Sequence, residues 1–227
     1  IDHKGDGIGR MPEYDVVIRR GLPGDFIKGK IVKKRRGRIE VEIVRIISSK
    51  IERIEPRCSH FGICGGCRWQ DISYEDQLIL KENVIMSALK SKNLVPQKME
   101  SILPSVDIYY YRNKMEFSFG SDRDGTLQLG LHIRGRYNRI FDLEKCYLQS
   151  SESNMLINAF RAGAKLYQLK PYNLKTHEGL LRFLVVREAK MKRQFMINLV
   201  VSEYPHRGID LLINYVCENV PQLTEIV

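Results

Sequence analysis

The first 56 residues alternate short apolar stretches with glycine-rich turns. Val16 to Ile18 and Phe26 to Val32 are apolar stretches typical of strands, and a Leu-Pro-Gly-Asp turn separates them. Ile39, Val41 and Ile43 then alternate with glutamates, which is the period of a strand with one buried face. Several short strands at this spacing predict a small β-barrel over residues 1–56.

Residues 57–227 show longer patterns, which predict helices as well as strands. Ser73 followed by Asp76 predicts a capped helix over residues 73–93. Residues 107–147 alternate as antiparallel strands do. A second helix is expected from Ser150 or Ser151 to about residue 169, then strands over 180–187 and 195–202, and a last helix over 207–219. The apolar stripe of the first helix contains Leu78, Val84, Ile85 and Leu89, and the buried side of the second contains Met155, Ala159, Phe160 and Ala162.

Composition and charge narrow the function classes. Hydrophobic residues make up 43% and charged residues 28% of 227 residues, as is usual for soluble globular proteins. No run approaches the about 20 apolar residues of a membrane span, and no signal pattern opens the chain, so we expect a cytoplasmic protein. The net charge is +10, and residues 1–57 contain 15 Lys/Arg against 9 Asp/Glu. This balance favours a polyanionic partner.

Three of the five cysteines, Cys58, Cys64 and Cys67, have the spacing Cys-x5-Cys-x2-Cys. Such spacing predicts a thiolate metal site, which usually needs a fourth ligand. Cys146 is the better candidate, because Cys217 lies in an apolar helical run where a small buried hydrophobe is commoner. Disulfides and a thioredoxin-type pair fit less well, given the odd cysteine count and the third cysteine upstream. The spacing leaves zinc and an iron–sulfur cluster both open.

The stretch Cys-Ser-His-Phe-Gly-Ile-Cys-Gly-Gly-Cys-Arg-Trp-Gln, from Cys58 to Gln70, resembles the cluster motif of the bacterial 23S rRNA (uracil-5-)-methyltransferases. Residues 1–56 likewise resemble a TRAM domain, a small OB-like barrel. The resemblance implies that Cys58, Cys64, Cys67 and Cys146 hold a 4Fe–4S cluster, which air can remove or replace with zinc. The implied fold class is α+β: the TRAM barrel, then a central domain of antiparallel sheet and helices over residues 57–227.

Basic residues recur at positions suited to RNA. Lys33, Lys34, Arg35 and Arg36 form a predicted hairpin tip, for which a solvated turn is the alternative. The stretch from Arg112 through Asn113 to Lys114 resembles a family signature facing RNA; exposed edge-strand charges are its alternative. The stretch from His177 to Arg187 resembles a family strand, with His177 itself expected to be exposed or bonded within a turn. The remaining candidates are Arg134, Arg136, Arg182 and Arg187.

The sequence shows no strand followed by Gly-x-Gly-x-Gly for S-adenosylmethionine, and no cysteine in an Asp-Pro-Pro-Arg-x-Gly context, where the family has its uracil nucleophile. We therefore expect no catalytic residue here. The expectation is an N-terminal portion of a 23S rRNA uridine-C5 methyltransferase, not catalytic alone, that binds ribosomal RNA without an obligate protein partner. Its helix over residues 73–93 would pack on the absent catalytic domain, where S-adenosylmethionine binds. The alternative is a standalone zinc-dependent RNA-binding module; electron transfer fits a basic barrel poorly.

Overall fold

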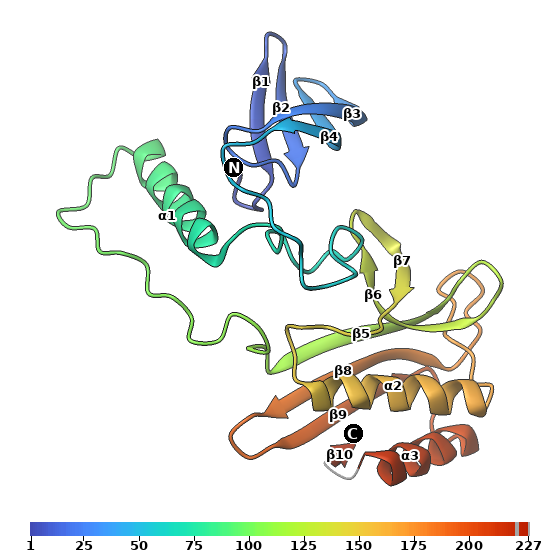
Figure 1. Cartoon of the computed structure of the whole chain (residues 1–227). Helices are drawn as coiled ribbons and strands as arrows, with labels where there is room; N and C mark the ends of the chain where they lie inside the picture. Colours follow the sequence, from blue (N-terminus) through green and yellow to red (C-terminus); the bar gives the residue numbers. More distant parts are fainter. Residues whose placement is uncertain (221–222, 227) are drawn as a thin grey trace. The chain divides into compact units, whose positions relative to one another are not determined.

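The computed structural model describes residues 1–220 and 223–226 (Figure 1). The chain forms two compact units with interleaved segments. The first contains residues 1–57 and 67–106, and the second contains residues 58–66 and 107–227. In the described part of the chain, no helix is long and apolar enough to cross a membrane.

The sheet of the first unit has four strands. They are β1 (Gly7–Met11), β2 (Tyr14–Arg19), β3 (Phe26–Arg35) and β4 (Arg38–Ser48), in the order β1-β2-β4-β3. Strands β2 and β4 are parallel, and the other neighbours are antiparallel. Val16, Ile39 and Val41 are buried on one face, as the alternation predicts.

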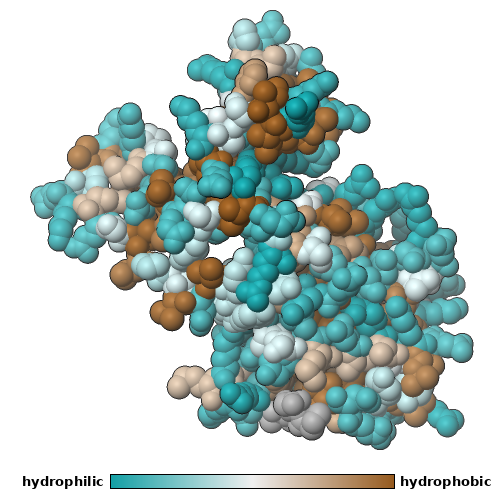
Figure 2. Space-filling model, in the orientation of Figure 1, coloured by the Kyte–Doolittle hydropathy of each residue, from teal (hydrophilic) through white to brown (hydrophobic). Residues whose placement is uncertain are grey.

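The predicted closed barrel is wrong. Strands β1 and β3 end the sheet on opposite sides, so within the described residues the sheet stays open. Alternation fixes which residues share a face of a strand, whereas pairing order depends on contacts distant in sequence. Apolar side chains that a closed barrel would cover are exposed, and Figure 2 shows brown atoms gathered on this sheet. They include Phe26, Ile31, Val32, Val44 and Ile47.

Helix α1 (Tyr74–Ser91) begins where the capping pattern predicts. The Ser73 hydroxyl accepts a hydrogen bond from the backbone N–H of Asp76 at 3.0 Å, which satisfies one free donor of the first turn. Leu80 is its buried side chain and packs with Leu22 and Ile72. The predicted stripe is only partly covered, because Ile85 is 47% exposed.

A buried ion network secures the first unit. Arg53 donates to Asp25 Oδ2 at 2.6 Å and also pairs with Asp71. Asp71 accepts a further hydrogen bond from Arg20 at 3.1 Å, and Asp25 accepts one from the backbone N–H of Leu22 at 2.8 Å. The Asp25 and Asp71 side chains are only 3% and 9% exposed. Two buried carboxylates are thus balanced by two guanidinium groups, as burial of charge requires.

The second unit is built on a six-stranded sheet, in the order β10-β9-β8-β5-β6-β7. The strands of residues 107–147 are antiparallel, as predicted, and β10 joins β9 in parallel, which makes the sheet mixed. The strands are β5 (Lys114–Ser121), β6 (Leu127–Ile133), β7 (Arg136–Asp142), β8 (Leu181–Ala189), β9 (Gln194–Val201) and β10 (Leu223–Ile226).

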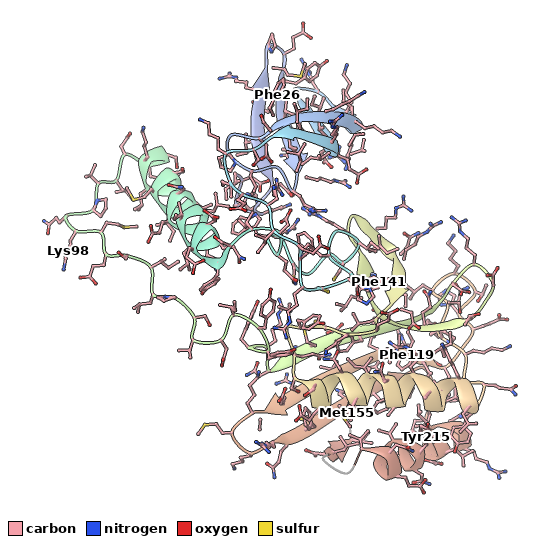
Figure 3. All side chains as sticks on the ribbon, in the orientation of Figure 1. Phe26, Lys98, Phe119, Phe141, Met155 and Tyr215 are labelled. Carbon is pink, nitrogen blue, oxygen red and sulfur yellow. The ribbon has the colours of Figure 1, made fainter. Side chains whose placement is uncertain are left out.

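Helices α2 (Ser151–Leu166) and α3 (Arg207–Asn219) complete this unit. Figure 1 shows α2 running along the sheet, and α2 meets α3 closely at Gly163, where a Cβ would come within 2.8 Å of the Tyr215 ring (Figure 3). The buried side of α2 contains Leu156, Ile157 and Phe160. Met155 and Ala162 are exposed, contrary to prediction, and so is Cys217 on α3.

The sheet of the second unit has one packed face and one open face. Phe117 on β5, Leu184 on β8 and Ile197 on β9 are fully buried. The residues that alternate with the buried ones on these strands are exposed or half-buried. They include Lys114, Glu116, Phe183, Val185, Arg187, Met196 and Asn198. The open face therefore presents charged, amide and aromatic side chains together.

Candidate functional site

Residues 58–66, which contain two of the predicted thiolate ligands, lie against the end of β6 in the second unit. Cys64 forms an antiparallel bridge with Ile133, next to the turn between β6 and β7. The backbone N–H of Arg134 donates to the Ile63 carbonyl at 2.9 Å, and that of Gly65 donates to the His132 carbonyl at 3.4 Å. The segment is thereby fixed by backbone hydrogen bonds.

A second attachment joins this segment to the loop that carries Cys146. His60 Nε2 accepts a hydrogen bond from the backbone N–H of Glu144 at 3.1 Å. The His60 ring also lies 4.8 Å from the ring of Phe141, which is labelled in Figure 3. Glu144 is two residues from Cys146, so the structure ties the segment of Cys58 and Cys64 to the Cys146 loop.

The backbone of Cys146 is fixed by a buried asparagine on α2. The Cys146 N–H donates to Asn154 Oδ1 at 2.7 Å, and Asn154 Nδ2 donates to the Cys146 carbonyl at 2.9 Å. Sequence patterns did not indicate Asn154, although it lies one turn inside a capped helix. This pair of hydrogen bonds fixes the loop that presents the thiol.

The thiols themselves differ in exposure. Cys58, Cys64 and Cys67 are half-buried and Cys146 is buried; Cys67 belongs to the first unit. Cys64 Sγ accepts a hydrogen bond from the backbone N–H of Gly66 at 3.3 Å, the kind of contact that stabilises a thiolate. Outside residues 221–222 and 227, no three His, Cys, Asp or Glu residues form a group that could hold a metal ion.

The basic candidates of the first unit lie on β3 and the turn after it. Lys33, Lys34 and Arg35 end the strand, Arg36 opens the turn, and all four are exposed. The turn is thus shorter than predicted, because β3 extends through Arg35 and contains three of the four residues. The Lys33 amine lies 3.8 Å from a Glu40 carboxylate oxygen. The Lys34 amine lies 4.8 Å from the centre of the Tyr14 ring.

In the second unit, the structure brings two separate candidates together. Lys114 on β5 lies directly opposite Arg187 on β8, and both are exposed. Arg112 and Asn113 precede Lys114, also exposed, and the Asn113 carbonyl accepts a hydrogen bond from the Glu188 N–H at 2.9 Å. Like charges at directly opposite positions repel each other. An anion bound there would relieve this repulsion.

The remaining candidates occupy two other places. Arg134 and Arg136 flank the turn between β6 and β7, beside the cysteine segment. Arg182 lies at the start of β8 with its guanidinium 4.8 Å from the centre of the Tyr172 ring. Sequence reasoning missed Tyr172, which lies just outside the stretch from His177 to Arg187. An aromatic residue near a basic strand was the available signal.

Comparison with known proteins gives several matches. No model of a known protein family matches the chain. An uncharacterised RNA methyltransferase of Caldanaerobacter subterraneus is 36% identical over 213 residues, which are 93% of this chain and 47% of the relative. Uncharacterised RNA methyltransferases of Chlorobaculum tepidum and Clostridium tetani are each 33% identical, over 86% and 92% of this chain and 44% and 46% of their own lengths.

The chain is similar to RNA methyltransferases. It spans about half the length of the curated relatives it matches. Its backbone also matches part of a solved structure, the tRNA (uracil-54, C5)-methyltransferase of Pyrococcus abyssi in complex with S-adenosyl-L-homocysteine. The TM-score is 0.64 at 24% identity, over 93% of this chain and 46% of that one. This likeness concerns the fold.

These matches correct three expectations. The assignment to the 23S rRNA enzymes is contradicted, because the relatives are described only as RNA methyltransferases and the solved match is a tRNA enzyme. The α+β fold with a TRAM barrel is replaced by two mixed sheets and three helices, within the described residues, matching that enzyme. The expected portion without catalytic function is contradicted as well, since the matches to methyltransferases extend over 93% of the chain.

Proposed function

We propose that this protein is an RNA methyltransferase that transfers a methyl group from S-adenosylmethionine to C5 of a uracil. The observation that carries the proposal is the 36% identity, over 93% of the chain, to a curated RNA methyltransferase. The fold match to a tRNA (uracil-54, C5)-methyltransferase supports uracil C5 as the target atom. The test is methyl transfer to RNA, read as 5-methyluridine.

Charge supports RNA as the substrate. The net charge is +10, and each phosphate contact by Lys or Arg releases condensed counterions. We assign phosphate contacts to two exposed groups. One consists of Lys33, Lys34, Arg35 and Arg36 on the first unit. The other consists of Arg112, Lys114 and Arg187 on the second unit, with Asn113 beside them. Half-buried Arg134 and exposed Arg136, which flank the turn between β6 and β7, are further candidates.

The donor implied by this class is S-adenosylmethionine, which supplies an electrophilic methyl group. Such nucleotide-like ligands commonly bind at a glycine-rich connection from a strand to a helix, where the backbone can approach closely. In the second unit, the connections to α2 and α3 are residues 143–150 and 202–206, and neither contains a glycine. These connections do not fit the donor, so no residue described here is assigned to it.

The cysteine segment suits a second, structural role. We infer that Cys58, Cys64 and Cys146, with Cys67 as the fourth thiol by sequence spacing, bind a 4Fe–4S cluster or zinc. The support is the attachment of residues 58–66 to the Cys146 loop through His60 and Glu144. In the described residues, these thiols do not form a group that could hold a metal ion. Binding would therefore require them to move together when the metal is bound.

A further inference from the structure

Residues 170–181 form a loop whose two ends are joined by backbone hydrogen bonds. The backbone N–H groups of Leu180 and Leu181 donate to the Lys170 carbonyl at 2.8 and 3.0 Å. Inside the loop, the Asn173 N–H donates to the Glu178 carbonyl at 2.7 Å. These hydrogen bonds define one conformation of the loop, at the start of β8.

A glycine makes this closure possible. Gly179 has φ +99°, and a Cβ there would lie 2.1 Å from the Pro171 carbonyl oxygen. No L side chain fits that space, so this close approach of two backbone segments depends on glycine. The Gly179 carbonyl also accepts a hydrogen bond from the Ser202 hydroxyl at 2.8 Å, which attaches the loop to the end of β9.

The loop holds the half-buried ring of Tyr172 beside the exposed ring of His177. The Tyr172 hydroxyl lies 3.0 Å from His177 Nδ1, and the two rings are 6.3 Å apart at 62°. His177 has φ +59°, a left-handed conformation that L-residues other than glycine adopt at a cost. His177 is exposed and contributes nothing to the core. A strained residue kept at the surface points to a functional site.

Arg182 completes the cluster. Its guanidinium lies 4.8 Å from the centre of the Tyr172 ring and 5.9 Å from that of Phe183, so two aromatic rings fix it. Among the described residues Arg182 forms no ion pair, and its contacts are with the rings of Tyr172 and Phe183. A planar cation held in this way offers a flat face for stacking and unused N–H donors for a phosphate or a base edge.

We propose that Tyr172, His177 and Arg182 form a subsite for an unpaired RNA nucleotide, whose base stacks on the Arg182–Tyr172 pair. Proteins bind single-stranded RNA by stacking bases on aromatic rings and on arginine planes beside a basic surface. Exposed Lys170 and Lys175 on the same loop supply that basic surroundings. The subsite rests on the proposed action on RNA and adds a recognition mode to it.

The test compares two probes on the 227-residue chain: a labelled oligouridine and an abasic oligomer of the same length and charge. Arg182→Lys keeps the positive charge but removes the planar guanidinium group, and Tyr172→Leu removes the aromatic ring. Each variant should weaken oligouridine binding about tenfold and leave abasic binding within about twofold. Tyr172→Phe keeps the ring and should bind as the wild type does.

The matched control is Lys192→Gln in the turn at the opposite end of β8, which should weaken both oligomers slightly and equally. Circular dichroism checks that each variant is folded. Equal losses for both oligomers in a folded Arg182→Lys, or no loss, would overturn the subsite while leaving the proposed function intact. A wild-type chain that binds neither these oligomers nor folded RNA would overturn both proposals.

Discussion

Lys114 and Arg187 lie directly opposite each other on the neighbouring strands β5 and β8, which makes two positively charged side chains a cross-strand pair. Cross-strand like charges destabilise a sheet by a few tenths to about 1 kcal/mol. The arrangement is costly in the isolated chain and favourable once a phosphate lies between the two side chains. We therefore treat this pair as the best-supported anion contact of the second unit.

Lys114→Gln should raise the free energy of unfolding by about 0.2–1 kcal/mol, because it removes this repulsion. The same change should weaken RNA binding and reduce the slope of log K against log salt by about 1. Urea denaturation and salt-dependent RNA titrations measure the two effects. Lys192→Gln serves as the control, because Lys192 lies in the turn between β8 and β9, outside the paired positions of these strands. An unchanged salt slope for Lys114→Gln would remove this pair from the interface.

Arg53→Ala should destabilise the first unit by about 3–5 kcal/mol, because it leaves Asp25 and Asp71 buried with one guanidinium fewer. Lys98 provides the contrast: it pairs with Glu100 at 2.6 Å, but its side chain is 79% exposed (Figure 3). Lys98→Ala should change stability by less than about 1 kcal/mol. Similar losses for both variants in denaturant titrations would contradict the network described here.

Gly179→Ala should disorder the loop of residues 170–181, since the new Cβ would meet the Pro171 carbonyl oxygen. Gly125→Ala is a matched control, because Gly125 has φ +82° but nothing within 4 Å of a Cβ. The control should lose only about 1 kcal/mol from backbone strain, and Gly179→Ala should lose clearly more. Hydrogen exchange of the loop amides distinguishes the two. Equal protection in both variants would show that the loop does not depend on this close approach.

Glu152 in the first turn of α2 gives a pH prediction. Hydrogen bonds from its own backbone N–H and from the Ser151 hydroxyl lower its carboxyl pKa, with a further contribution from the charge of Arg193. A lowered pKa stabilises the fold above the ordinary value of 4.5, and this stabilisation is lost as pH falls through the folded-state pKa. Glu152→Gln should therefore lose stability at neutral pH and match the wild type in acid. Because Glu152 is only partly buried and water screens its charge, the difference should stay below about 1 kcal/mol. A loss that persists unchanged at low pH would exclude this charge effect.

Metal content tests the cysteine assignment. Anaerobically purified protein should contain about four irons with sulfide, or one zinc, per chain. Cys146→Ala should lose that metal, whereas Cys217→Ala should retain it, since Cys217 is exposed on α3. Full metal content in Cys146→Ala would refute the ligand set. No metal in the wild type would refute the site altogether.

Local patterns predicted local structure well. The alternation of Ile39 and Val41 marked a strand with one buried face, and Ser73 and Ser150 cap the helices that they were expected to cap. Each of these features is determined by residues within a few positions of one another. The buried side of α2 was predicted only in part. Met155 was expected to be buried but is exposed, and Leu156 and Ile157 are buried instead.

Contacts between distant residues were harder to predict. The closed barrel failed because β2 pairs in parallel with β4, which no alternation pattern encodes. The meeting of Lys114 with Arg187 and the placement of Tyr172 beneath Arg182 depend on strand order and on a closed loop. Basic residues could be named as candidates from charge, but the chain had to fold before any two of them could be assigned to one surface.

The measurement that most directly tests the central claim is methyl transfer. The intact natural protein that carries this sequence would be incubated with S-adenosylmethionine labelled in its methyl group and with unmodified tRNA and rRNA transcripts. After nuclease digestion, the label should appear in 5-methyluridine from one RNA and be absent with heat-inactivated protein. Label in no nucleoside of either RNA would contradict the account.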